Sequence, residues 1–167
     1  MHFTRRQTLA ALFATLASPA LPGLAHADDG KDGLVFGPPA PFSFESLKQT
    51  AMAASKQPWV DMRSPYGAIL DKIDYDNFQA IIFDPDHALW ADGKGGAPIQ
   101  LFHLGKYFQE PVQIYLLEDG SAREILYRQN YFKLPPKHPA HDLPDDIGFA
   151  GFRVEAPSQK TDWLAFL

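Results

Sequence analysis

Few residues of this sequence have the types and spacing that catalysis requires. Asp84-Pro85-Asp86-His87 places two carboxylates beside an imidazole, a combination that transfers protons when it lies in a cleft. Asp-Pro-Asp is also typical of a turn, and the segment separates two short apolar runs, so the sequence favours a turn. Asp145-Asp146 is a second acidic pair, but adjacent residues rarely face one site, and glycosidase carboxyl groups lie about 5–10 Å apart on separate elements. We therefore assign no catalytic residue.

Metal and cofactor ligands are equally scarce. The sequence has no cysteine, which excludes disulfides and thiolate ligands. His138 and His141 have a spacing that would suit two ligands on a helix, but the prolines between residues 135 and 144 exclude a regular helix there. We expect a solvated loop and no metal site. Gly93-Lys94-Gly95-Gly96 lacks the remaining residues of a phosphate-binding loop, and no cofactor is expected.

Aromatic side chains are abundant, at 13% of the residues. Flat aromatic faces beside hydrogen-bonding groups are typical of sugar sites. Trp90, His103 and Tyr107 are therefore the candidate carbohydrate-binding residues. The alternative is that most of these rings fill the core of a sheet protein.

The elements that would position these residues are mostly short strands. One helix is predicted over residues 44–56, with Ser43 as its N-cap and apolar residues at helical spacing. Strands bounded by turn residues are predicted at 80–83, 87–90, 99–104, 112–117, 122–127 and 151–155. Glu118-Asp119-Gly120-Ser121 has the composition of a hairpin turn. This order predicts a mainly β protein, an antiparallel β-sandwich with one N-terminal helix.

The first 27 residues predict export. Arg5 and Arg6 are the only Lys or Arg residues before Asp28, and an apolar stretch follows them. Ala25 and Ala27 end that stretch and form the small-x-small pattern at which signal peptidases cleave. A paired arginine in this place favours the twin-arginine export machinery, with an ordinary secretory signal as the alternative. Prolines interrupt the stretch and no later apolar run is long enough, so no stable membrane span is expected.

Charge and composition constrain the rest of the chain. Without residues 1–27, the chain has 13 Lys and Arg residues against 20 Asp and Glu residues, a formal charge of −7. That balance disfavours nucleic acid and anionic membranes as partners and leaves neutral ligands such as sugars open. Residues 28–41 are rich in Gly, Pro and Asp and are expected to be a linker. Residues 42–167 would then form the folded part of a periplasmic protein.

Short sequence patterns along residues 42–167 resemble one known family. In chain order they are Phe42-Ser43-Phe44-Glu45-Ser46-Leu47, residues 75–84, Ala88-Leu89-Trp90, residues 102–108 and residues 146–154, which contain Gly-Phe-Ala-Gly-Phe-Arg. Together they resemble the N-terminal part of the periplasmic glucans biosynthesis protein family, the G and D proteins. The twin-arginine signal is closer to the D type.

The resemblance implies a large β-sandwich related to carbohydrate-processing folds, followed by a smaller immunoglobulin-like domain. D-type proteins resemble inverting β-1,2-glucan hydrolases with two acidic residues, and in the family these acids lie beyond the position of Leu167. Family members are much longer than this chain. Residues 42–167 are therefore expected to be a truncated part of the sandwich, inactive alone and prone to aggregate.

The sequence thus predicts an exported protein of osmoregulated periplasmic glucan biosynthesis or processing, whose full-length form acts on β-glucan backbones. The expected partners are β-glucan polysaccharide and the twin-arginine export machinery. A non-catalytic carbohydrate-binding or accessory module is the alternative, and an exported β protein without a sugar role is a third possibility.

Overall fold

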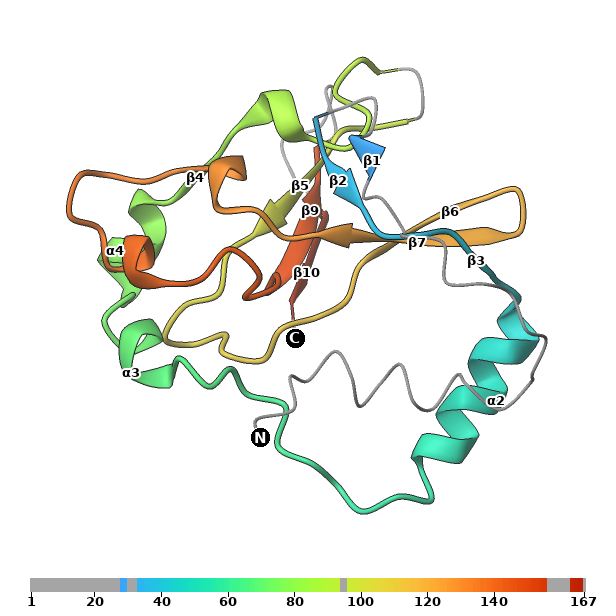
Figure 1. Cartoon of the computed structure of the whole chain (residues 1–167). Helices are drawn as coiled ribbons and strands as arrows, with labels where there is room; N and C mark the ends of the chain where they lie inside the picture. Colours follow the sequence, from blue (N-terminus) through green and yellow to red (C-terminus); the bar gives the residue numbers. More distant parts are fainter. Residues whose placement is uncertain (1–27, 30–32, 94–95, 156–162, 167) are drawn as a thin grey trace.

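The computed structural model describes residues 28–29, 33–93, 96–155 and 163–166 (Figure 1). The strands are β1 (Asp28–Asp29), β2 (Val35–Phe36), β3 (Ala40–Pro41), β4 (Ile82–Phe83), β5 (Ile99–Phe102), β6 (Tyr115–Glu118), β7 (Ser121–Leu126), β8 (Phe132–Lys133), β9 (Gly151–Val154) and β10 (Trp163–Phe166). The helices are α2 (Phe44–Ala54), α3 (Gly67–Leu70) and α4 (Tyr75–Ala80), with 3-10 turns η1 (Pro85–His87), η2 (Gln129–Tyr131) and η3 (Pro139–Asp142). The predicted export signal, residues 1–27, lies outside the described residues.

All strand pairs of the described residues are antiparallel, which confirms the predicted fold class. One sheet has the order β1-β2-β7-β3 with β6 also paired to β7, a second has the order β10-β9-β5, and a third pairs β4 with β8. In the second sheet Gln100 pairs with Arg153 and Leu101 with Phe152, so neighbouring pairs face opposite sides of the sheet. The fold is mainly β, with one longer helix near its N-terminal end.

The hairpin predicted at residues 118–121 is present and joins β6 to β7. Its two central residues, Asp119 and Gly120, have φ angles of 49° and 74°. Positive φ at both central residues is what a type I′ turn requires, and Asp-Gly satisfies it at low cost. The turn fixes the register, in which Glu118 pairs with Ser121 and Leu117 with Ala122.

Aromatic rings make up much of the core, as the alternative interpretation of these residues expected. The rings of Tyr127 and Phe132 are stacked with centroids 5.6 Å apart, and Phe149 packs on Tyr127 at 5.3 Å. All three side chains are buried. Each such ring stabilises the fold by about 1.5–3 kcal/mol relative to an exposed position.

Helix α2 forms where the sequence predicts it. Ser46 donates its backbone N–H to Ser43 Oγ at 3.0 Å, and Ser43 N–H donates to Ser46 Oγ at 3.2 Å, which closes a capping box. No residue of the helix is buried. In Figure 1 the helix stands to one side of the sheets, at the end of β3. Local signals therefore form this helix with little help from packing.

Part of the segment expected to be a linker belongs to the sheet. Leu34 and Phe36 are buried, β2 pairs with β7, and β3 also pairs with β7. The Gly and Pro content around them suggested a linker, but Leu34 and Phe36 are apolar enough to enter the core. Residues 34–41 are therefore part of the folded sheet and not a linker.

The prediction of a strand at residues 87–90 is wrong. Asp84 accepts a hydrogen bond from Asp86 N–H at 3.2 Å and starts η1, so His87 lies in a 3-10 turn. Leu89 makes a single bridge to Ile99, and Trp90 has a φ of 61°. The turn interpretation of Asp84-Pro85-Asp86 is confirmed, because the Asp cap and the proline together set the backbone.

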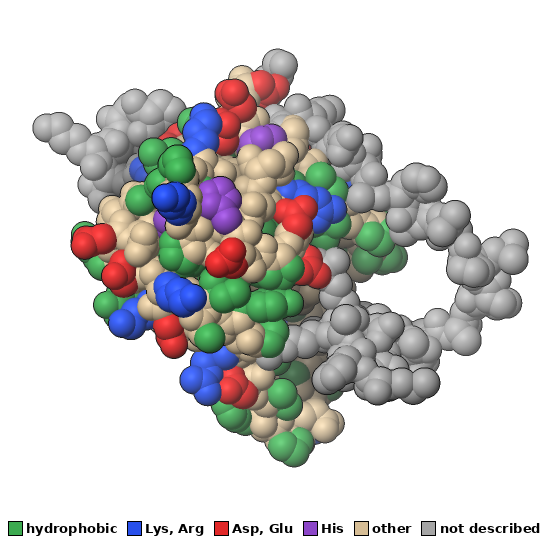
Figure 2. Space-filling view, turned by 60° about the vertical axis from the view of Figure 1, so that its left-hand side comes forward, with side chains coloured by type: hydrophobic (Ala, Val, Ile, Leu, Met, Phe, Trp, Pro, Cys, Tyr) green, Lys and Arg blue, Asp and Glu red, His purple; other side chains and the backbone are tan. Residues whose placement is uncertain are grey.

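Figure 2 views the molecule from the side that carries α3 and α4. Acidic and basic side chains are interspersed there with apolar ones. On this face the described residues form no extended basic patch. Among the described residues, no helix has the length and hydropathy needed to cross a membrane.

Candidate functional site

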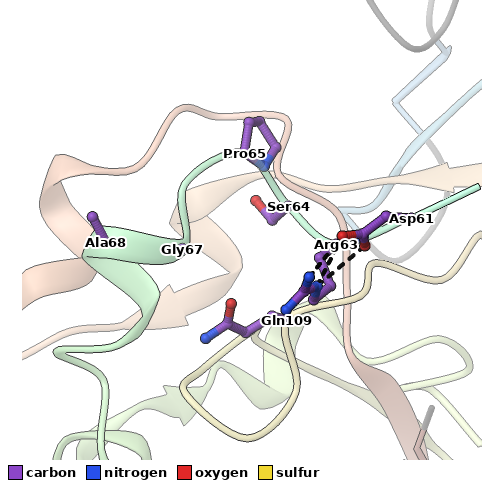
Figure 3. Close-up of a pocket in the computed structure, with 7 residues that line it drawn as sticks. All are labelled: Asp61, Arg63, Ser64, Pro65, Gly67, Ala68 and Gln109. Atoms are coloured by element: carbon purple, nitrogen blue, oxygen red, sulfur yellow. Dashed lines mark hydrogen bonds and ion pairs between the residues drawn. The ribbon is translucent and has the colours of Figure 1, made fainter.

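A polar hollow lies where the segment leading into α3 meets the loop around residue 109. It has a volume of about 420 Å³. Its lining, shown in Figure 3, is Asp61, Arg63, Ser64, Pro65, Gly67, Ala68 and Gln109. We call it the polar hollow. Its walls supply a cation, a carboxylate, a hydroxyl and an amide, which are groups that hydrogen-bond to hydroxylated ligands.

The charged wall of the hollow is an Asp61–Arg63 pair. Arg63 Nη2 lies 2.7 Å from Asp61 Oδ2, and Arg63 Nε lies 3.1 Å from both carboxylate oxygens. Asp61 also accepts the backbone N–H of Arg63 at 2.9 Å, which holds the two residues in one turn. The hydrogen bond and charge of Asp61 raise the pKa of Arg63 above its ordinary value. The pair therefore presents a fixed set of donors and acceptors to solvent.

Gln109 fixes the opposite wall. Its backbone carbonyl accepts the N–H of Ser64 at 2.8 Å, which ties the two loops together. Its side-chain Nε2 donates to Asp71 Oδ1 at 2.8 Å, so the amide is held against α3. Ser64 Oγ accepts the N–H of Tyr66 at 3.3 Å. In the part of the chain that the structure describes, no hydrogen bond joins Ser64 to a histidine.

Exposed aromatic rings come from the same two loops. Tyr107 is 66% exposed and lies two residues before Gln109 in the chain. Trp59 is 81% exposed and lies two residues before Asp61. Exposed flat rings next to hydrogen-bonding groups suit the apolar faces and hydroxyl edges of sugars.

The structure places the three predicted sugar-binding residues in different surroundings. Tyr107 is exposed on the loop that carries Gln109. Trp90 is half-buried and packs against the core. His103 is 1% exposed, so its ring belongs to the interior. Of the three, only Tyr107 lies beside the polar hollow in the chain.

His103 is nonetheless chemically distinctive. Its Nδ1 lies 2.6 Å from the carbonyl oxygen of Leu104. Its ring meets Tyr127 and Phe132 edge-on, with centroids 5.7 and 5.1 Å away. Burial lowers its pKa from 6.5 to about 4. Among the described residues its Nε2 has no hydrogen-bond partner.

The histidines near residue 140 do not form the expected solvated loop. His138 is buried, its Nδ1 accepts Ala140 N–H at 3.1 Å, and its Nε2 lies 3.0 Å from Asn77 O. These contacts start η3 and attach it to α4. His141 is exposed and contacts Pro135 O. Among the described residues, no group of three or more His, Cys, Asp or Glu side chains could hold a metal ion.

The acidic candidates make structural contacts. Asp84 lies 3.0 Å from Lys133 Nζ, and hydrogen bonds from Lys133 and Asp86 lower its pKa. Asp145 accepts the N–H of Gln129 and lies 4.0 Å from Arg128 Nε. Both carboxylates hold chain segments together, and neither lines the polar hollow.

The sequence did not predict the polar hollow. In the sequence, the segment before α3 shows only an aromatic residue, Trp59, followed by the charged residues Asp61 and Arg63. Gln109 lies far along the chain, and its hydrogen bonds with Ser64 and Asp71 bring it there. A contact of that kind leaves no pattern in the sequence.

Comparison with known proteins identifies the family. The model of the family described as "Periplasmic glucan biosynthesis protein, MdoG" matches residues 42–167. Glucans biosynthesis protein D 2 of Ralstonia nicotianae is 41% identical over 175 residues, which cover 98% of this chain and 32% of that protein. Glucans biosynthesis protein D of Stenotrophomonas maltophilia is 38% identical over 170 residues, 99% of this chain and 31% of that protein. Glucans biosynthesis protein D of Xanthomonas oryzae pv. oryzae is 37% identical over 172 residues, which cover 100% of this chain and 32% of that protein.

The chain thus spans about a third of the length of these relatives, and the match extends over nearly all of it. The family model covers the region in which the sequence patterns lie. This chain belongs to the periplasmic glucan biosynthesis protein (MdoG) family.

Proposed function

We propose that the protein binds β-glucan chains during periplasmic glucan biosynthesis, and that the polar hollow contributes to that binding. The observation that carries the proposal is the family match over residues 42–167, together with relatives named glucans biosynthesis protein D. The geometry of the hollow supplies the chemistry. Asp61, Arg63 and Gln109 line the hollow and supply groups that hydrogen-bond to sugar hydroxyls. Tyr107 is not part of the lining, but it is exposed two residues before Gln109 and offers a ring face.

We propose binding rather than hydrolysis for the described part of the chain. Hydrolysis of a glycosidic bond takes two carboxyl groups that flank one scissile bond. Asp61 is the one carboxylate among the residues that line the hollow, and it is paired with Arg63.

The test is a calorimetric titration of the purified full chain with linear β-1,2-glucan. We expect saturable binding, with Kd raised about tenfold in Tyr107→Ala, because one sugar–ring contact is lost. Tyr115→Ala is the matched control, since Tyr115 is an exposed tyrosine on β6 and should leave Kd unchanged. A flat titration would overturn the binding proposal. Release of short glucans by the chain would overturn its non-catalytic part.

We also propose that the protein works in the periplasm after twin-arginine export. The family is named for periplasmic glucan biosynthesis, and Arg5 and Arg6 precede an apolar stretch. Replacing both arginines with lysine keeps the charge and removes the recognised pair. We expect the variant to stay in the cytoplasm on cell fractionation; normal export would argue for an ordinary secretory signal.

A further inference from the structure

We infer that Asp71 is a positioning residue of the polar hollow: it orients the side-chain amide of Gln109 so that the amide oxygen faces the ligand. The hollow then selects sugar hydroxyl groups that are free to donate a hydrogen bond. The inference rests on the proposed function, because it assigns the specificity of the same site. Asp71 is not among the described residues that line the hollow, so it acts through Gln109.

The NH2 group of Gln109 is fully occupied by the protein. Its Nε2 atom donates to Asp71 Oδ1 at 2.8 Å and to the backbone carbonyl of Lys106 at 3.2 Å. A carboxylate and a carbonyl oxygen both accept and cannot donate, so the amide atom between them is the nitrogen. A side-chain amide has two N–H donors, and these two acceptors use both. The oxygen is therefore the part of the amide that remains for a ligand.

The oxygen of Gln109 faces the hollow. In Figure 3 it points toward the segment that carries Ser64 and Gly67, while the nitrogen points away from Ser64. A Cβ atom added at Gly67 would lie 3.4 Å from Gln109 Oε1, which places the oxygen against the start of α3. Among the described residues no hydrogen bond to this oxygen is formed. An acceptor held in this position can take a hydrogen bond from a bound hydroxyl group.

Asp71 is itself held in place by α3. It is the C-cap of that helix, and its backbone N–H donates to the carbonyl oxygen of Gly67 at 2.8 Å. Gln109 is held at its other end, because its backbone carbonyl accepts the N–H of Ser64 at 2.8 Å. Contacts within the protein thus set the orientation of the amide before a ligand binds, and such preorganisation lowers the cost of binding.

This orientation distinguishes a free hydroxyl group from an ether. A hydroxyl group donates to Gln109 Oε1, whereas an ether oxygen has only lone pairs and faces the amide oxygen without a proton between them. Asp61, the carboxylate of the hollow, also only accepts. Two groups of the hollow therefore require a ligand that donates, and free glucan hydroxyl groups fit it better than methylated ones.

The test compares two ligands in calorimetric titrations of the full chain. They are linear β-1,2-glucan and the same glucan with its hydroxyl groups methylated. In the unmodified chain we expect methylation to raise the Kd at least about threefold, since at least one hydrogen bond is lost. Asp71→Asn lets the Gln109 amide turn, because an asparagine amide can donate to the Gln109 oxygen as well as accept from its nitrogen. In that variant the ratio of the two Kd values should fall by about threefold or more.

The ratio of two Kd values is unaffected by a general loss of folded protein, so a purely structural role of Asp71 would not change it. Asp76→Asn is the matched control, because Asp76 is an exposed carboxylate on α4 that does not line the hollow, and the change in charge is the same. An equal ratio in Asp71→Asn and Asp76→Asn would overturn the inference.

NMR of the Gln109 side-chain NH2 protons gives a second measurement, which needs no ligand. The proton that donates to Asp71 should resonate downfield in the unmodified chain and in Asp76→Asn, because its acceptor is a carboxylate. In Asp71→Asn it should move upfield. An unmoved resonance in that variant would mean that Asp71 does not orient the amide, and the inference would be wrong.

The outcome also separates this inference from the proposed function. If linear glucan binds and Tyr107→Ala weakens it while Asp71→Asn leaves the ratio of Kd values unchanged, the positioning role is wrong and the proposed function stands. If neither the free nor the methylated glucan binds, both are wrong.

Discussion

The hydroxyl of Tyr131 accepts a hydrogen bond from the backbone N–H of Val35 at 2.7 Å, across 96 residues of sequence. Tyr131 itself is buried in the core. Val35 pairs with Leu126 of β7, so the hydrogen bond anchors β2 to the interior as well as to the sheet. This contact explains why residues near 35 are part of the fold although their neighbours have linker composition.

Tyr131→Phe should therefore destabilise the fold. The substitution keeps the ring and removes the acceptor of Val35 N–H, which is partly buried. Losing one partner of such a hydrogen bond costs about 1–3 kcal/mol. Urea denaturation followed by tryptophan fluorescence measures the loss. Tyr107→Phe is the control, because Tyr107 is exposed, and equal stability of the two variants would contradict the role of this contact.

His103 should make the stability of the fold depend on pH. Its folded-state pKa is lowered from 6.5 to about 4. Above pH 6.5 the imidazole is neutral in both states and contributes no pH dependence. As the pH falls from 6.5 to about 4, the unfolded chain binds a proton that the folded chain does not, so stability is lost. The shift corresponds to about 3 kcal/mol in all.

Urea denaturation at a series of pH values tests this dependence. Protonation of carboxylates such as Asp84, whose pKa is lowered, also destabilises the fold as the pH falls. The test therefore compares the unmodified chain with a variant that lacks the His103 imidazole. The free energy of unfolding should fall more steeply between pH 6.5 and 4 in the unmodified chain than in His103→Phe, which lacks the imidazole at position 103. Parallel curves would mean that His103 titrates alike in the two states.

The close approach of Gly148 to Pro111 should make the fold sensitive to substitution at this position. Its φ is 87°, and a Cβ there would lie 2.7 Å from Pro111 Cβ. Gly148→Ala should combine backbone strain of about 1–2 kcal/mol with a steric clash that costs about 1–3 kcal/mol. Gly93 has a φ of 72° and no atom of the described residues within 4 Å of its added Cβ, so Gly93→Ala should show the strain alone. A thermal denaturation series in which the two variants lose equal stability would rule out the clash with Pro111.

The sequence predicts the helices and turns whose formation depends on a few neighbouring residues. Ser43 as an N-cap gives α2, and Asp119-Gly120 gives the β6–β7 hairpin, because a capping hydroxyl and a type I′ turn act over a few residues. The antiparallel fold class followed from the number of short strands and turns. Helix α4 was not predicted from the sequence; Asp74 accepts the N–H of Asn77 and starts this helix.

The candidate site could be predicted only in part. Tyr107 was selected for its residue type, and its exposure beside Gln109 agrees with a role at the surface. His103 was selected for the same reason, but the sequence could not show that its ring is buried against Tyr127. Burial depends on which strands pack together, and the contacts that decide it join residues far apart in the chain. For that reason Asp61 and Gln109 also could not be linked to one hollow.

Ser43→Ala should separate the stability of α2 from that of the rest of the fold. The change removes the hydroxyl that accepts Ser46 N–H and costs the helix about 1 kcal/mol. Because no residue of α2 is buried, the helix contributes little to the core, and global unfolding in urea should be nearly unchanged. Hydrogen exchange should show faster exchange of α2 amides alone, with Thr50→Ala, an exposed change later in the helix, as the control. If Ser43→Ala instead lowered global stability by the full cost of the cap, α2 would be packed on the sheets in solution, and its exposed Phe44 and Leu47 would mark the face that makes the contact.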